Sequence, residues 1–233
     1  MKRAFIVAIA ALLITSLAVL LLRLIESRQR ARFESFIRSL KDPDPRARAG
    51  AADFLGSIGP DARVCIPELE EALSDNDPYV RVCAAGALWK LDHGKRDQVI
   101  PILVAELNRE GRLHNVIAVK TLGEMGPEAE AAVPALEKLL KADSTYQQTL
   151  VAGALAQIDK SSRKATFEIL KRGLRDEHQG PRMEALQVLA KLGTDAREFA
   201  PDLRLLQNDP DGAVQQYAEV ALKAIEGNAR PNR

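Results

Sequence analysis

The chain has 233 residues, and 33 lysines and arginines against 32 aspartates and glutamates leave a formal net charge of +1. That balance argues against a nucleic-acid partner, because nucleic-acid-binding proteins usually carry a basic excess, and 46% hydrophobic with 28% charged residues excludes wholesale disorder. The two cysteines, Cys65 and Cys83, exclude a disulfide-dense scaffold and a four-cysteine zinc site. We assign no bridge between them and expect two small buried side chains.

A long apolar segment lies at residues 4–22, which contain no charged side chain. As a helix it would span about 28 Å, close to the ~30 Å hydrocarbon thickness of a bilayer. The best match to a signal-peptide cleavage site, Ser16-Leu17-Ala18, is poor, and the apolar run continues beyond it. We therefore predict an uncleaved transmembrane helix that contacts lipid through residues 4–22, with residues 1–32 forming the anchor and a basic linker.

The basic residues around this segment give two conflicting indications of its orientation. Arg23, Arg28, Arg30 and Arg32 follow the segment, which favours a cytoplasmic folded domain by the positive-inside rule. The short basic start, Lys2-Arg3, resembles a secretory n-region and favours the outer side of the membrane. We take the second, with the folded domain on the periplasmic or extracellular side. Because no glycine or proline precedes Asp42, we expect the anchor helix to run on into the first helix of that domain.

An internal repeat of 33 or 34 residues fills the rest of the chain. Its clearest column is a leucine: Leu55, Leu88, Leu122, Leu155, Leu189 and Leu222. Four residues earlier stands a small residue: Ala51, Ala84, Ala118, Val151, Ala185 and Ala218. This spacing predicts a helix with one apolar face in each unit. We expect helices of adjacent units to approach closely at the small-residue column, where a larger side chain would hold them apart.

A second helix is predicted upstream of the leucine helix, with a proline in its first turn. The prolines are Pro67, Pro101, Pro134 and Pro201, and Glu168 replaces proline once. Turn segments such as Asp42-Pro43-Asp44-Pro45 and Asp75-Asn76-Asp77-Pro78 separate the two helices and supply N-caps. Gly59, Gly126 and Gly193 stand where a left-handed cap would close the leucine helix.

The pattern D-x-D-P-x-V-R-x-x-A-A-x-x-L, as in residues 75–88, resembles the HEAT-like repeats of the phycobilisome-lyase type. The resemblance covers residues 33–226 and implies an all-α fold, an α-solenoid of about six helix pairs, followed by a polar tail at residues 227–233. Such repeats mostly serve as binding surfaces, so the function it implies is a scaffold for another protein. We expect a single transmembrane helix to precede this solenoid.

Catalytic constellations are not evident in the sequence. The three histidines, His93, His114 and His178, have no histidine partner at metal-binding spacing, and no nucleophile or phosphate-binding motif occurs. Related HEAT-like hydroxylases bind iron through His-Glu pairs, and this chain has no His-Glu dipeptide. We predict a non-enzymatic protein with no cofactor or metal. The alternatives are an enzyme or enzyme subunit related to bilin lyases or iron hydroxylases, and a spacer without a ligand.

Candidate partner-binding residues are Arg48, Arg81, Arg182 and Trp89. The arginines share one column of the leucine helix, and in HEAT-like repeats an arginine here often bonds an aspartate of the neighbouring unit; the other interpretation is a partner contact. Trp89 interrupts a column of small or polar residues. It either fills a gap against the next unit or stands exposed as a binding hot spot.

Overall fold

The computed structural model describes residues 16, 17, 20, 27, 28, 30–107, 112–141 and 143–227, with only the backbone at 112–114. Every regular element in this part of the chain is an α-helix or a 3-10 helix, which confirms the predicted all-α repeat solenoid. The helices form two compact units, one ending at Lys95 and one beginning at Arg96. We call these two compact units unit 1 and unit 2, and from here on we use the word repeat for each helix pair.

In unit 1 the first continuous helical segment among the described residues, at 30–39, contacts the first leucine helix. Phe33 and Leu40 are buried, and the Phe36 ring stacks on Phe54 with 4.6 Å between centroids. The elements that follow are α2 (Pro45–Ile58), η1 (Pro60–Cys65), α3 (Ile66–Ala72), α4 (Pro78–Leu91) and η2 (His93–Lys95).

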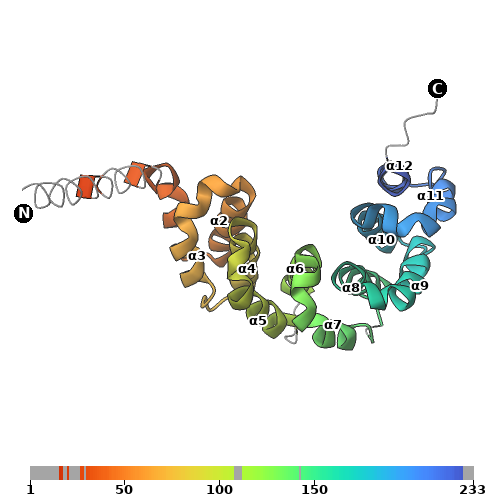
Figure 1. Cartoon of the computed structure of the whole chain (residues 1–233), viewed down its shortest axis with the longest axis horizontal. Helices are drawn as coiled ribbons and strands as arrows, with labels where there is room; N and C mark the ends of the chain where they lie inside the picture. The colour runs from red at the N-terminus through yellow and green to blue at the C-terminus, as the bar shows by residue number, and fades with distance from the viewer. Residues whose placement is uncertain are drawn as a thin grey trace, which may run out of the picture. The chain divides into compact units, whose positions relative to one another are not determined.

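Unit 2 continues the alternation of short and long helices. Its elements are α5 (Arg96–Leu107), α6 (Arg112–Met125), η3 (Gly126–Ala132), α7 (Val133–Leu139), α8 (Thr145–Ile158), η4 (Lys160–Ser162), α9 (Arg163–Leu174), α10 (Gln179–Leu192), η5 (Gly193–Phe199), α11 (Ala200–Leu206) and α12 (Gly212–Glu226). Within this unit α6, α8, α10 and α12 lie side by side in one row, and α7, α9 and α11 form a second row (Figure 1).

The predicted leucine helices are α2, α4, α6, α8, α10 and α12, six in the described part of the chain. All six column leucines are buried, and so are all six members of the small-residue column. The aspartates Asp44, Asp77 and Asp211 cap α2, α4 and α12, each accepting a hydrogen bond from the backbone two residues on at 2.8–2.9 Å. The predicted register and N-caps are therefore confirmed.

Two pairs of neighbouring leucine helices approach closely at a glycine. A Cβ on Gly56 would lie 2.7 Å from the Cα of Ala87, and one on Gly123 would lie 3.1 Å from the Cα of Ala154. These glycines follow the column leucines by one residue. The backbones can approach at these two positions because glycine has no side chain.

Two local predictions need correction. Pro101 lies in the middle of α5 rather than in its first turn, because the helix begins at Arg96, so its ring removes one interior hydrogen bond of α5. Gly59 and Gly193 have the expected positive φ, 78° and 56°, but their ψ values of −148° and −131° place them outside the left-handed α region. That backbone region is essentially restricted to glycine.

No helix in the described residues is both long and apolar enough to cross a bilayer. The predicted span at residues 4–22 lies outside those residues, except for Ser16, Leu17 and Leu20. The predicted continuation of that helix into the folded domain is described only at residues 27, 28 and 30–39, which are helical, and the rest of the junction lies outside the described residues.

Candidate functional site

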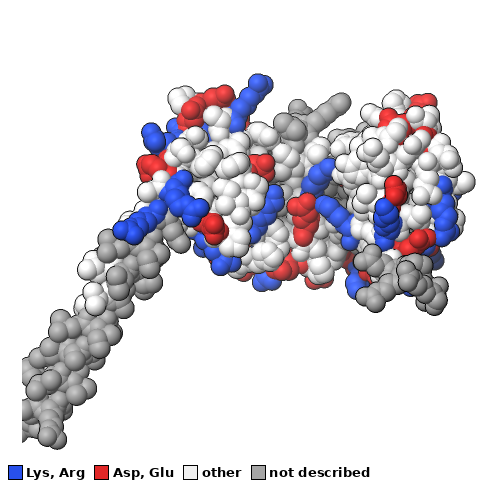
Figure 2. Space-filling model, turned by 90° about the horizontal axis from the view of Figure 1, so that it is seen from above, with Lys and Arg blue, Asp and Glu red and all other residues white. Residues whose placement is uncertain are grey.

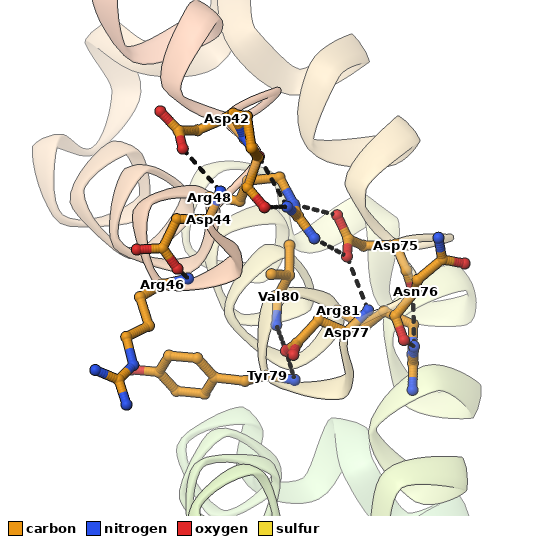
Figure 3. A network of polar contacts seen from close by, with 11 residues as sticks. Asp42, Asp44, Arg46, Arg48, Asp75, Asn76, Asp77, Tyr79, Val80 and Arg81 are labelled. Carbon is orange, nitrogen blue, oxygen red and sulfur yellow. Dashed lines mark hydrogen bonds and ion pairs between the residues drawn. The ribbon is translucent and has the colours of Figure 1, made fainter.

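Two arginines of the predicted column bond aspartates one repeat further along, and we call these bonds the arginine ladder; Figure 3 shows the first of them. Arg48 of α2 donates from Nε and Nη2 to the two carboxylate oxygens of Asp75, at 2.7 and 2.8 Å. Its third nitrogen, Nη1, donates to the carbonyl oxygens of Asp42 and Pro43 at 2.8 and 3.1 Å. Asp75 in turn accepts the backbone N–H of Asp77 at 2.8 Å. One guanidinium thus ties a turn of its own repeat to the next.

The ladder recurs in unit 2. Arg182 donates to Asp209 at 3.0 Å and to the carbonyl oxygens of Asp176 and Glu177 at 2.8 and 2.9 Å. Gln215 occupies the arginine position in the last repeat, and its amide donates to the carbonyl oxygen of Asp209 at 2.6 Å. The interaction predicted for the arginine column, a bond to the neighbouring repeat, is therefore present at Arg48 and Arg182.

The hydrogen bonds between Arg48 and Asp75 favour the charged form of both side chains. Hydrogen bonds from Arg48 lower the pKa of the Asp75 carboxyl, outweighing the opposing effect of its burial. The hydrogen bond to Asp75 likewise raises the pKa of Arg48. Arg81 donates to the carbonyl oxygens of Asp75 and Asn76 at 2.6 and 3.0 Å. Since these guanidinium groups are engaged within the chain, the ladder stabilises the stacking of repeats.

Trp89 is buried, with 6% of its surface exposed. Its indole stacks on the imidazole of His93, with 4.0 Å between ring centroids and 15° between the planes. Little of the ring remains for a partner to contact, so of the two interpretations above, the exposure favours packing.

The remaining reactive groups are two cysteines and three histidines. Cys65 and Cys83 are free and buried, as expected, and burial raises the pKa of the Cys83 thiol to about 12. His93 starts η2 and His178 is the N-cap of α10, while the side chain of His114 lies outside the described residues. Within the described ranges, no three His, Cys, Asp or Glu side chains converge in a way that would hold a metal ion.

A polar groove lies on the leucine-helix row of unit 2. It has a volume of about 250 Å³, and we call it the unit 2 groove. Three successive leucine helices line it: α6 with Val119, Lys120 and Glu124, α8 with Leu150, Ala154 and Gln157, and α10 with Glu184, Gln187, Val188 and Lys191. The groove therefore gathers side chains from three repeats on one surface.

Two ion pairs join the helices on either side of α8 across this groove. Lys120 of α6 lies 2.9 Å from Glu184 of α10, whose side chain is only 7% exposed. The Tyr146 hydroxyl donates a long hydrogen bond of 3.5 Å to the same carboxylate. Burial is the largest influence on Lys120 and opposes its charged form, but the hydrogen bond to Glu184 and the attraction of the nearby negative charges together outweigh it and raise the lysine pKa. The second pair, Lys191 with Glu124 at 3.0 Å, is about half exposed.

These groove residues were not among the sequence predictions. The signal that marks them is a departure within a column. Glu184 stands five residues before its leucine, where the other repeats have uncharged residues: Gly50, Cys83, Ile117, Leu150 and Tyr217. Across the face shown in Figure 2, acidic and basic side chains lie interspersed, and neither sign covers it alone. The groove offers paired charges and amides, which suits hydrogen-bonded recognition of a polypeptide better than attraction to a polyanion.

The family model for HEAT repeats matches residues 33–112 and 66–156, which together make just over half of the chain. The chain belongs to the HEAT-repeat family. A curated relative, the beta-2 subunit of the AP-3 complex from Mus musculus, is 38% identical over 99 residues. That alignment covers 40% of this HEAT-repeat chain and only 9% of the length of the AP-3 subunit.

Solved structures share the HEAT-repeat fold at lower identity. The complex of CpcE and CpcF of phycocyanin lyase from Nostoc sp. PCC7120 superposes with a TM-score of 0.57 at 22% identity, covering 86% of this chain and 85% of that one. An engineered protein superposes with a TM-score of 0.51 at 22% identity, covering 84% and 96% of the two chains. At such identities the likeness concerns the fold alone.

Proposed function

We propose that this protein is a membrane-anchored HEAT-repeat scaffold that binds another protein through the unit 2 groove. The observation that carries the proposal is the convergence of Lys120, Gln157 and Gln187, from three successive repeats, on one partly exposed polar surface. A surface assembled from several repeats presents many contacts at fixed spacing, which is how repeat proteins bind polypeptides.

A protein partner also agrees with the relatives. The AP-3 subunit and the CpcE–CpcF pair are both named as components of protein complexes. HEAT repeats supply binding surfaces rather than one particular chemistry, so the partner of this chain must be identified from its own groove.

Membrane attachment forms the second part of the proposal. Its support is the uncharged segment at residues 4–22 with basic residues on both sides. We place the repeat domain on the periplasmic or extracellular side, on the strength of the short Lys2-Arg3 start.

Site-specific photo-crosslinking tests the binding surface. A photoactivatable amino acid at Gln187, inside the groove, is compared with the same residue at Glu137, which is exposed on α7 in the other row. In membranes that contain the full chain, the Gln187 position should give a discrete adduct that the Glu137 position lacks. Identical adducts from both positions, or none from Gln187, would show that the groove is not the binding surface.

Extraction and mass measurement test the anchor. The protein should stay with the membrane in alkaline carbonate, and its intact mass should include residues 4–22. A mature start near Val19 would contradict the anchor. The orientation is tested separately by protease digestion of sealed inside-out vesicles, in which a repeat domain on the outer side should be protected.

The alternative function is that of an enzyme or enzyme subunit, and its support is the fold that this chain shares with a phycocyanin lyase. It makes a different prediction. An absorbance scan and metal analysis of protein purified from its source would reveal a bound pigment or iron under that alternative.

A further inference from the structure

Unit 1 contains a second polar pocket, separate from the unit 2 groove. Its volume is about 490 Å³, and it lies between the start of the repeat domain and the first complete helix pair. The lining includes four carboxylates, from Asp42, Glu68, Glu71 and Asp75, and two cations, from Lys41 and Arg48. Leu40 and Ala72 add apolar surface. The pocket therefore has a net negative lining with an apolar side.

Glu68 is the carboxylate that stands out in this pocket. Its side chain is 9% exposed, and its Oε2 atom is buried with no hydrogen-bond partner among the described residues. Arg48 already holds Asp75 within the ladder, and Glu71 pairs with Lys41 at 3.0 Å at the exposed rim. A buried carboxylate oxygen without a donor is costly, so this wall of the pocket favours the approach of a hydrogen-bond donor with positive charge.

The chain itself shows which donor fits. The guanidinium of Arg30, from the helical segment that precedes α2, pairs with the other oxygen of Glu68, Oε1. The Arg30 side chain is 46% exposed whereas Glu68 is buried, so the pair is open to solvent on the arginine side. An ion pair with one exposed partner contributes little to stability and can be exchanged for an equivalent one.

We propose that the unit 1 pocket binds an arginine side chain of a protein partner, in competition with Arg30. The incoming guanidinium would take the place of Arg30 at Glu68, while its aliphatic stem packs on Leu40 and Ala72. Guanidinium suits the site because its planar set of five donors can reach both oxygens of one carboxylate. Arg30 thus serves as an internal partner of Glu68 that the incoming arginine must displace.

This site extends the proposed function, because it would supply one anchor point for the same kind of partner. It nevertheless stands on residues of unit 1 alone. The crosslinking test at Gln187 can therefore fail while the pocket binds arginine, and the reverse also holds.

The test uses the full chain in a non-ionic detergent and measures the affinity for N-acetyl-arginine amide by titration calorimetry. N-acetyl-citrulline amide, which has the same shape without the charge, is the matched probe. Three variants are compared with the parent: Glu68→Gln in the pocket, Arg30→Ala at the internal occupant, and Glu130→Gln at an exposed position in unit 2. Circular dichroism establishes that each variant is folded.

The arginine probe should bind saturably. The affinity for the citrulline probe should be lower by at least about tenfold. Glu68→Gln should weaken arginine binding by about tenfold, and Glu130→Gln should leave it unchanged. Arg30→Ala should strengthen it by about two- to sixfold, because a competing exposed ion pair is removed. Equal binding of both probes, insensitivity to Glu68→Gln, or absent or weaker binding to the Arg30→Ala variant would each overturn the proposal.

Discussion

Lys120 of α6 and Glu184 of α10 form an ion pair at 2.9 Å although 64 residues separate them and a complete helix, α8, stands between. The pair is possible because α8 presents small residues, Gly153 and Ala154, in this region. A Cβ on Gly153 would lie 2.3 Å from the Cγ2 atom of Val188, which shows how closely α8 and α10 approach. The small residues of α8 therefore allow α10 to pack closely against it.

Removal of Lys120 should destabilise the fold through the carboxylate that it leaves behind. In Lys120→Met the Glu184 charge stays buried with only the long bond from Tyr146, which should cost about 1–3 kcal/mol of unfolding free energy. Lys191→Met is the matched control, because it breaks the half-exposed pair between the same two helices and should cost less than about 1 kcal/mol. Urea unfolding followed by circular dichroism measures both. Equal losses would contradict the distinction between the buried and the exposed pair.

Two glycines of α2 should respond in opposite directions to alanine. Gly56→Ala places a methyl group 2.7 Å from the backbone of Ala87 and should destabilise the protein by about 1–3 kcal/mol. Gly50 has no atom within 4 Å of the added Cβ, so Gly50→Ala should stabilise α2 by about 0.5–1 kcal/mol through helix propensity. Thermal melts of the two variants test this, and a stabilising Gly56→Ala would mean that α2 and α4 are further apart than described.

The Arg48–Asp75 bond should make part of the stability sensitive to acid. The pKa of Asp75 is lowered in the folded state, so its contribution is present above the ordinary carboxyl pKa of 3.8 and is lost as pH falls through the lower folded value. Asp75→Asn should therefore reduce the loss of stability below about pH 4. Asp53→Asn, at an aspartate whose side chain is 73% exposed, is the control and should leave the acid limb in place. Unfolding free energies measured from pH 7 to 2.5 decide the matter.

Trp89 is the only tryptophan, so its fluorescence reports one environment. Because the side chain is buried, emission should be blue-shifted and resistant to iodide. Trp89→Ala should lower the unfolding free energy by about 3–5 kcal/mol. A red-shifted, quenchable emission, together with loss of partner capture at unchanged stability, would restore the hot-spot interpretation.

The repeat register was predictable because it depends on local patterns. Leu122 and its equivalents recur at a fixed spacing, and a helix converts that spacing into one buried face. The caps at Asp44, Asp77 and Asp211 follow from side chains that bond backbone groups two or three residues away. The bonds of the arginine ladder were also predictable. Their aspartate partners lie about one repeat length away in the sequence, and the repeat makes that separation regular.

The candidate sites depend on distances that the sequence does not encode locally. Glu184 is an isolated charge in an apolar column until α6 brings Lys120 to it, and Trp89 is ambiguous until His93 is found stacked on its ring. The sequence by itself determined the helices, their caps and the repeat, because these arise from contacts within about one repeat length. Only the tertiary structure decided which charges meet across α8 and which carboxylate, Glu68, is left with a free oxygen among the described residues, because burial and ion pairing depend on how closely the helices pack.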